Sequence, residues 1–248
     1  MEKWEKVLNE FLKEYVDDDS ILGAILGGSY ATGNYTENSD IDISIITTND
    51  NYKKRGNVII DDIMMEYFIN PISELKKYME DDYNNRHRLS TSNLIGNGKI
   101  IFSKNNIMED LQKEALSYYK KEFPTPNETK VKCQKYACWD AYDELKDKVK
   151  NNESYNLNYF VLLQNLIDCY YYSNNIASVP ISKLEQILRN KEYARKYNLK
   201  NEPSEEFKRL VLECIDTISI DKIDELYKFV IKDWNITDFV LENDEQKY

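Results

Sequence analysis

Residues 21–47 read ILGAILGGSYATGNYTENSDIDISIIT, in which a polar segment separates two apolar runs. The first run, Ile21 to Leu26, has the length of a buried strand, and the glycines that follow it end the strand abruptly. Tyr30 to Gly33 is predicted to form one or two helical turns. The second run, Asp40 to Thr47, is rich in β-branched residues and predicts a central strand. The stretch therefore predicts a strand, a short helix, a polar loop and a second strand.

Two features of this stretch suit the binding of a polyphosphate and a metal ion. Glycines such as Gly28 let the backbone approach a ligand closely, and a helical turn starting at Ser29 offers free N–H groups and a hydroxyl to an anion. Asp40 and Asp42 are two apart on a predicted strand, so both face the same side, where their charges repel unless a cation lies between them. Mg²⁺ prefers carboxylate oxygens together with substrate phosphates. Either feature alone is typical of a turn or a solvated strand end, but together they predict a nucleoside triphosphate site.

Regular elements are predicted on both sides of this stretch. An apolar stripe from Trp4 to Tyr15 at helical spacing predicts an opening helix. Residues 58–60 and 63–69 predict either a strand pair or one long bent strand. The other elements expected before residue 105 are helices at 72–82 and 90–95 and a short strand at 99–103.

From about Met108 the pattern becomes entirely helical, and a Pro-Thr-Pro sequence at 124–126 marks the junction. The predicted helices cover residues 108–121, 128–151, 155–175, 181–197, 204–217 and 220–233. We therefore predict an α+β fold in which residues 1–122 form a mixed sheet flanked by helices and residues 123–248 form an all-helical bundle. The charged tail after Asn243 is expected to fray.

Composition and charge exclude several classes of protein. The formal net charge of −11 opposes general nucleic-acid binding, which needs clustered Lys and Arg. No run of 18 apolar residues and no apolar signal-peptide core occur in the sequence, so a cytoplasmic protein without a membrane span is expected. The four cysteines lack C-x-x-C spacing and the chain has one histidine, which favours reduced thiols over a zinc site.

The stretch from Gly28 to Asp42 resembles the G-S-x10-D-x-[DE] signature of the polymerase-beta-like nucleotidyltransferase superfamily. Gly28, Ser29, Asp40 and Asp42 match it, with ten residues between the serine and the first aspartate. The element order over residues 1–105 also fits that superfamily. The helical segment resembles, in layout more than in residues, the C-terminal domains of bacterial antibiotic nucleotidyltransferases that modify aminoglycosides or lincosamides.

The resemblance implies a third carboxylate on a neighbouring strand, for which Asp61, Asp62 and Glu66 are candidates. Glu66 is a lone charge inside an apolar strand, where a carboxylate is costly without a partner, whereas a turn explains the other two. We therefore choose Glu66. The superfamily more often has Asp at this place, so Glu66 can be a metal ligand, the acceptor of the attacking hydroxyl's proton, or both.

Other clusters of charged residues can be explained either by a functional role or simply by exposure to solvent. Arg86 and Arg88 flank His87 and are candidates for contacting the triphosphate or the base, although a surface helix end explains them equally well. Lys53 to Arg55 is predicted to be a solvated loop. Three carboxylates on a predicted helix either line a pocket for a cationic acceptor or are simply solvated: Asp140, Asp143 and Glu144.

The sequence thus predicts a Mg²⁺-dependent nucleotidyltransferase that moves a nucleoside monophosphate, AMP from ATP or the equivalent from another triphosphate, to a hydroxyl of a small molecule. One or two Mg²⁺ ions are expected. The acidic chain suits a cationic acceptor, so an aminoglycoside-type antibiotic, and hence antibiotic resistance, is the leading candidate. The helical domain is expected to line the acceptor cleft, and the resemblance implies a homodimer as one assembly. The alternatives are transfer to a protein or tRNA, as in toxin–antitoxin systems, and a non-catalytic nucleotide-binding module.

Overall fold

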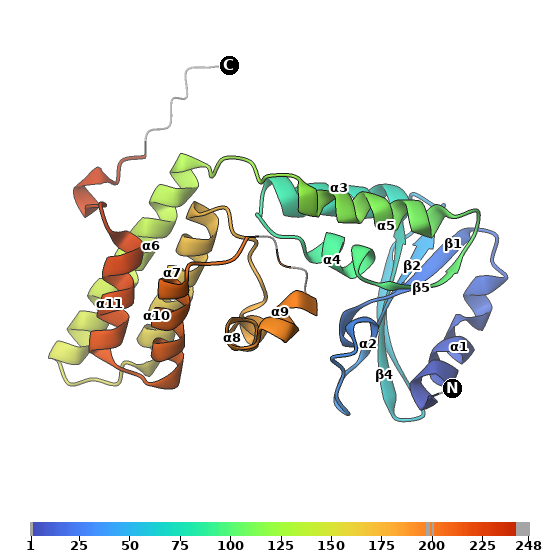
Figure 1. Cartoon of the computed structure of the whole chain (residues 1–248), viewed down its shortest axis with the longest axis horizontal. Coiled ribbons are helices and arrows are strands. Elements are labelled where there is room, and N and C mark those ends of the chain that lie inside the picture. The colour runs from blue at the N-terminus through green and yellow to red at the C-terminus, as the bar shows by residue number, and fades with distance from the viewer. Residues whose placement is uncertain (1, 197–198, 200, 242–248) are drawn as a thin grey trace, which may run out of the picture. The chain divides into compact units, whose positions relative to one another are not determined.

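The computed structural model describes residues 2–196, 199 and 201–241 (Figure 1). The chain divides into two compact units, of which the first runs to Glu122 and the second starts at Phe123, with Arg195 and Lys196 grouped with the first. The tail predicted to fray after Asn243 lies outside the described residues.

A five-stranded mixed sheet forms the centre of the first unit (Figure 1). Its order is β3-β4-β2-β1-β5, and β2 pairs in parallel with β4 while the other neighbours are antiparallel. The central position of β2 confirms the prediction for this strand. The strands are β1 (Ile21–Leu26), β2 (Ile41–Thr47), β3 (Lys54–Ile60), β4 (Ile63–Pro71) and β5 (Lys99–Ser103).

Helices cover both faces of this sheet. Helix α1 (Lys3–Val16) buries its apolar stripe, including Leu8, in one core with Ile41 and Ile43 of β2. Because side chains alternate along a strand, Asp42 faces the opposite side, where α3 and α5 contact β4 and β1. The remaining helices of the unit are α2 (Gly28–Thr32), α3 (Ile72–Asn84), α4 (Ser90–Gly96), α5 (Ile107–Ser117) and the 3₁₀ turn η1 (Tyr118–Lys120).

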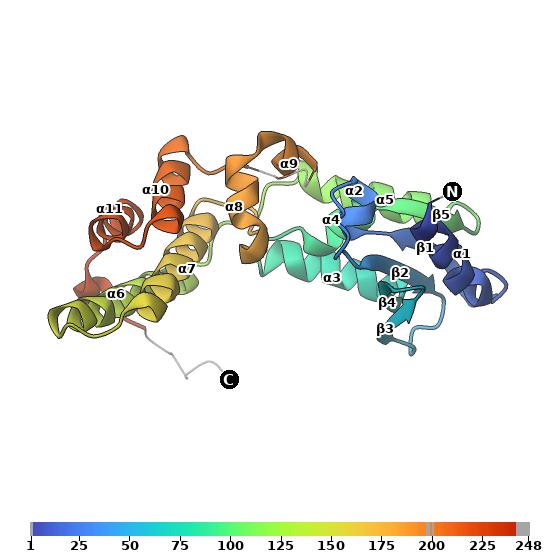
Figure 2. The same cartoon turned by 90° about the horizontal axis from the view of Figure 1, so that it is seen from below.

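The second unit is helical (Figure 2), and it has its own hydrophobic core. Tyr159 and Phe207 are its largest fully buried side chains, and the Tyr159 hydroxyl donates to the carbonyl oxygen of Cys214 at 3.0 Å. The α+β class is therefore confirmed. The helices are α6 (Glu128–Lys150), α7 (Asn156–Ser173), α8 (Ile181–Arg189), α9 (Lys191–Lys196), α10 (Glu205–Asp216), α11 (Ile220–Ile231) and η2 (Ile236–Asp238).

Two predicted elements differ from the structure. The single helix expected at 181–197 is wrong, because Asn190 has an extended backbone and its Oδ1 accepts the N–H groups of Glu192 and Tyr193 at 3.0 Å, which ends α8 and caps α9. The solvated loop expected at Lys53 to Arg55 is present only at Lys53, since β3 begins at Lys54, although all three residues are exposed. The strand pair, rather than one bent strand, is present at 54–71.

All four cysteines are free thiols, with Cys133 exposed and the others buried. No helix within the described part of the chain has both the length and the apolarity needed to cross a membrane.

Candidate functional site

The parallel pairing of β2 and β4 brings together carboxylates that are far apart in the sequence. Asp42 on β2 lies directly opposite Glu66 on β4 in the register. Asp40 immediately precedes Ile41, the first residue of β2, so it lies just outside the strand on which it was expected. Being two residues before Asp42, it still faces the same side of the sheet.

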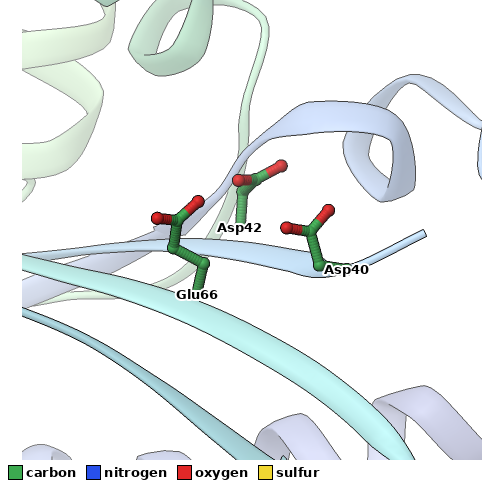
Figure 3. A group of neighbouring side chains, drawn as sticks. All are labelled: Asp40, Asp42 and Glu66. Atoms are coloured by element: carbon green, nitrogen blue, oxygen red, sulfur yellow. The ribbon is translucent and has the colours of Figure 1, made fainter. Parts of the chain in front are cut away.

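The three carboxyl groups form one cluster (Figure 3). One carboxylate oxygen from each of Asp40, Asp42 and Glu66 lies within 4.8 Å of the other two, and all three side chains are half-buried. Figure 3 shows the groups projecting from the same side of the two strands. Three hard oxygen donors at this spacing are the ligand set that Mg²⁺ or Mn²⁺ prefers.

Burial and mutual repulsion make the cluster unfavourable as three free anions. Partial burial, followed by the charges of Asp40 and Glu66, raises the pKa of Asp42 from its ordinary value to about 6. A divalent cation would compensate this repulsion, so the residues present fit a metal ion.

A glycine packs against the cluster at the start of α2. Gly28 has a φ of +60°, and a Cβ atom built on it would lie 1.9 Å from Oδ2 of Asp42. The preceding Gly27 donates its N–H to the carbonyl oxygen of Asp42 at 2.8 Å. This contact holds the first turn of α2, which contains Ser29, beside the carboxylates. The structure therefore brings the predicted Gly28 and Ser29 next to the acidic cluster.

An open pocket of about 310 Å³ lies beside α2, and Gly28 is one of its lining residues. Residues of α2 and of the segment around α4 line it, namely Gly28, Ala31, Thr32, Asn93, Leu94, Asn97 and Gly98.

Arg86 and Arg88, the candidates for contacting the triphosphate or the base, form ion pairs with carboxylates on α3. Arg86 pairs with Asp81 at 2.7 Å, and Arg88 pairs at 2.6 Å with Asp82, whose side chain is only 3% exposed. Asp82 also accepts both the N–H and the hydroxyl of Thr91. Among the described residues, neither arginine forms an ion pair with the acidic cluster, so their triphosphate contact stays a prediction.

Sequence reasoning missed one residue at the cluster, Arg55 on β3. Its Nε donates to Oε1 of Glu66 at 2.8 Å, and its Nη2 donates to the same oxygen. The turn at Asp61 and Asp62 is the signal that could have revealed it. With Ile60 paired to Ile63 across that turn, counting back along both strands places Arg55 opposite Phe68, two pairs away from Glu66 and on the same face of the hairpin.

The acidic residues proposed on the helical unit lie on α6 and are exposed. Asp143 pairs with Lys146 at 3.1 Å, and Glu144 accepts the side-chain amide of Asn158 at 3.2 Å. The structure therefore leaves open both interpretations of Asp140, Asp143 and Glu144.

Comparison with solved structures finds similarity to the crystal structure of a nucleotidyltransferase-like protein from Exiguobacterium sibiricum. The two are 14% identical, the match covers 92% of this chain and 76% of that chain, and the TM-score is 0.42. No curated protein matches the chain. A family model described as "Nucleotidyltransferase domain" matches residues 6–121, the region that carries the sheet, Gly28, Ser29 and the acidic cluster. The family model therefore identifies residues 6–121 as similar to nucleotidyltransferase domains of the polymerase-beta-like type.

Proposed function

We propose that this domain transfers a nucleoside monophosphate, AMP from ATP in the first instance, to a hydroxyl group of a small molecule in a Mg²⁺-dependent reaction. The match of residues 6–121 to a nucleotidyltransferase domain supports nucleotidyl transfer in general. The observation that carries the finer proposal is the convergence of Asp40, Asp42 and Glu66 beside Gly28.

In this proposal each residue of the site has a distinct task. Asp40 and Asp42 would hold one or two Mg²⁺ ions, with Glu66 as a third ligand or as the proton acceptor. When bound, the metal neutralises charge on the phosphoryl oxygens and lowers the pKa of the acceptor hydroxyl. The backbone N–H groups after Gly28 and the hydroxyl of Ser29 would hold the phosphates.

The transfer conserves atoms and charge in one displacement. The acceptor oxygen forms a bond to the α-phosphorus while the bond from that phosphorus to the bridging oxygen breaks, and pyrophosphate leaves. The proton of the acceptor hydroxyl passes to Glu66 or to solvent. Arg86 and Arg88 would contact the triphosphate through the N–H groups that Asp81 and Asp82 do not use.

For the acceptor we propose a cationic hydroxylated molecule of the aminoglycoside type, modified in the cytoplasm as a form of antibiotic resistance. The net charge of −11 supports this because an acidic protein attracts cations. We further propose that residues 123–248, including the exposed acids of α6, supply the acceptor side of the site, and that a homodimer is one assembly in which this occurs.

The test is incubation of the full chain with Mg²⁺ and each α-³²P-labelled nucleoside triphosphate, together with a panel of aminoglycosides and lincosamides. We expect labelled antibiotic from at least one aminoglycoside, none without Mg²⁺, and about 100- to 1,000-fold slower labelling with D42N. Label on a protein band or on tRNA would instead establish transfer to a macromolecule. Tight ATP binding without label on any acceptor would overturn transfer and identify a nucleotide-binding module.

A further inference from the structure

The ion pair between Arg55 and Glu66 adds a positive charge to the acidic cluster. Among the described residues, Arg55 is the only cation that forms an ion pair with Asp40, Asp42 or Glu66, and its partner is Glu66. The side chain of Glu66 is 17% exposed, whereas that of Arg55 is 71% exposed. The arginine therefore reaches from solvent to a carboxylate that is mostly shielded from water.

This ion pair contributes little to the stability of the fold. Strand β3 is an edge strand of the sheet, and an ion pair with an exposed arginine contributes little to stability because water screens the charge and holding a long side chain in place costs entropy. The backbone hydrogen bonds of β3 and β4 hold the hairpin in register without Arg55. Any large effect of removing this side chain must therefore come from what it does to Glu66.

Its geometry restrains the carboxylate of Glu66. Both Nε and Nη2 of Arg55 donate to Oε1, and no described residue donates to Oε2. The guanidinium also lies over the ring of Phe68, 5.0 Å from its centroid, on the strand position directly opposite Arg55. The guanidinium of Arg55 therefore contacts the Phe68 ring as well as Oε1 of Glu66. These contacts limit the rotation of the Arg55 and Glu66 side chains.

We propose that Arg55 is a positioning residue, which binds one oxygen of Glu66 so that the other stays available to the metal or to the acceptor proton. This inference rests on the function proposed above. Groups that orient a metal ligand typically change metal affinity or activity about 10–100-fold when removed. An exposed arginine reduces metal affinity only slightly through its charge, because water screens it, so the loss of orientation should dominate.

The first experiment measures Mn²⁺ binding to the full chain without nucleotide, from the free-Mn²⁺ electron paramagnetic resonance signal. We expect R55A to weaken binding about tenfold. The matched control is K54A, which removes a cation from the adjacent position of the same strand, where Lys54 lies over Tyr67 on the opposite face. K54A should bind Mn²⁺ as the wild type does, and D42N should bind it far more weakly.

These outcomes separate the two hypotheses. Equal Mn²⁺ affinity of R55A, K54A and the wild type overturns the positioning role of Arg55 and leaves the proposed function intact. A wild-type chain that binds no Mn²⁺, or binds it unchanged in D42N, overturns the proposed function and this inference with it.

The second experiment uses the transfer reaction and its kinetic constants. We expect R55A to lower kcat about 10–100-fold with KM for ATP changed less than about threefold. R55K should recover part of kcat, since lysine keeps the charge but lacks the planar pair of N–H donors. A higher KM with unchanged kcat would make Arg55 a substrate-binding residue and overturn the inference.

Discussion

The α-carbon of Gly28 lies so close to the carboxylate of Asp42 that a methyl group there would come within 1.9 Å of Oδ2. We therefore expect G28A to displace the carboxylate and to impair metal binding and transfer. It should also destabilise the fold by more than the roughly 1–2 kcal/mol that a left-handed backbone costs alanine. Urea unfolding and Mn²⁺ binding measure the two effects.

Gly33 provides the control for this substitution. Its φ is +70°, similar to that of Gly28, but a Cβ atom built on it meets no atom within 4 Å. G33A therefore carries the backbone strain alone and should leave Mn²⁺ binding unchanged. Equal losses of stability and metal affinity in G28A and G33A would show that contact with Asp42 is irrelevant.

D42N should abolish most of the transfer activity while the protein stays folded. Metal-assisted stabilisation of transition-state charge is worth several kcal/mol, so kcat should fall about 100- to 1,000-fold. At neutral pH, Mg²⁺ should raise the thermal midpoint of the wild type and not that of D42N, because a ligand stabilises only a fold that binds it. Near-normal turnover of D42N with Mg²⁺ contradicts the assignment of the site.

The metal-free protein should lose stability as pH rises through the titration of Asp42. The folded state raises the pKa of this carboxyl to about 6 from 3.8, so the folded chain binds the proton more tightly than the unfolded chain. The free energy of unfolding then falls between about pH 4 and pH 6 and stays lower above that range. D42N lacks this titration.

Urea unfolding at pH 4.5 and pH 7.5, in the presence of a chelator, measures this effect. The difference between the two pH values should be larger for the wild type than for D42N by on the order of 1 kcal/mol, allowing for solvent screening at a half-buried site. If the wild type and D42N lose equal unfolding free energy between these pH values, then the ionisation of Asp42 does not destabilise the fold.

Arg88 and Arg86 should differ in their contribution to stability. Arg88 compensates the buried carboxylate of Asp82, so R88A should cost about 2 kcal/mol, since Asp82 keeps its bonds to Thr91. R86A removes an exposed pair with Asp81 and should cost less than about 1 kcal/mol. Urea unfolding distinguishes them, and equal losses would refute the distinction. A raised KM for ATP in R86A would support its predicted triphosphate contact.

Most elements could be predicted from the sequence because glycine, proline or polar residues bound each apolar run. The break at Asn190 could not, because the apolar spacing of Leu184, Ile187 and Ala194 continues across it and favours one helix. The side-chain cap of a single asparagine outweighs that periodicity locally.

The candidate site was predictable where its residues are close in sequence. The spacing of Asp40 and Asp42 places both on one face, whatever the rest of the chain does. The pairing of Asp42 with Glu66 depends on a parallel contact between β2 and β4, which no local pattern encodes and which only the family resemblance suggested. Arg55 was missed because its neighbour is set by the β3–β4 register rather than by adjacent residues.

The hairpin turn at Asp61 and Asp62, where both residues have a positive φ, therefore affects the chemistry of a centre to which neither residue belongs. Side chains alternate between the faces of a strand, so a one-residue insertion between Gly56 and this turn would place Gly56 opposite Phe68 and move Arg55 to the other face, away from Glu66. Homologues that vary in length at this turn should differ in the partner of the third carboxylate, even where all three acidic residues are retained.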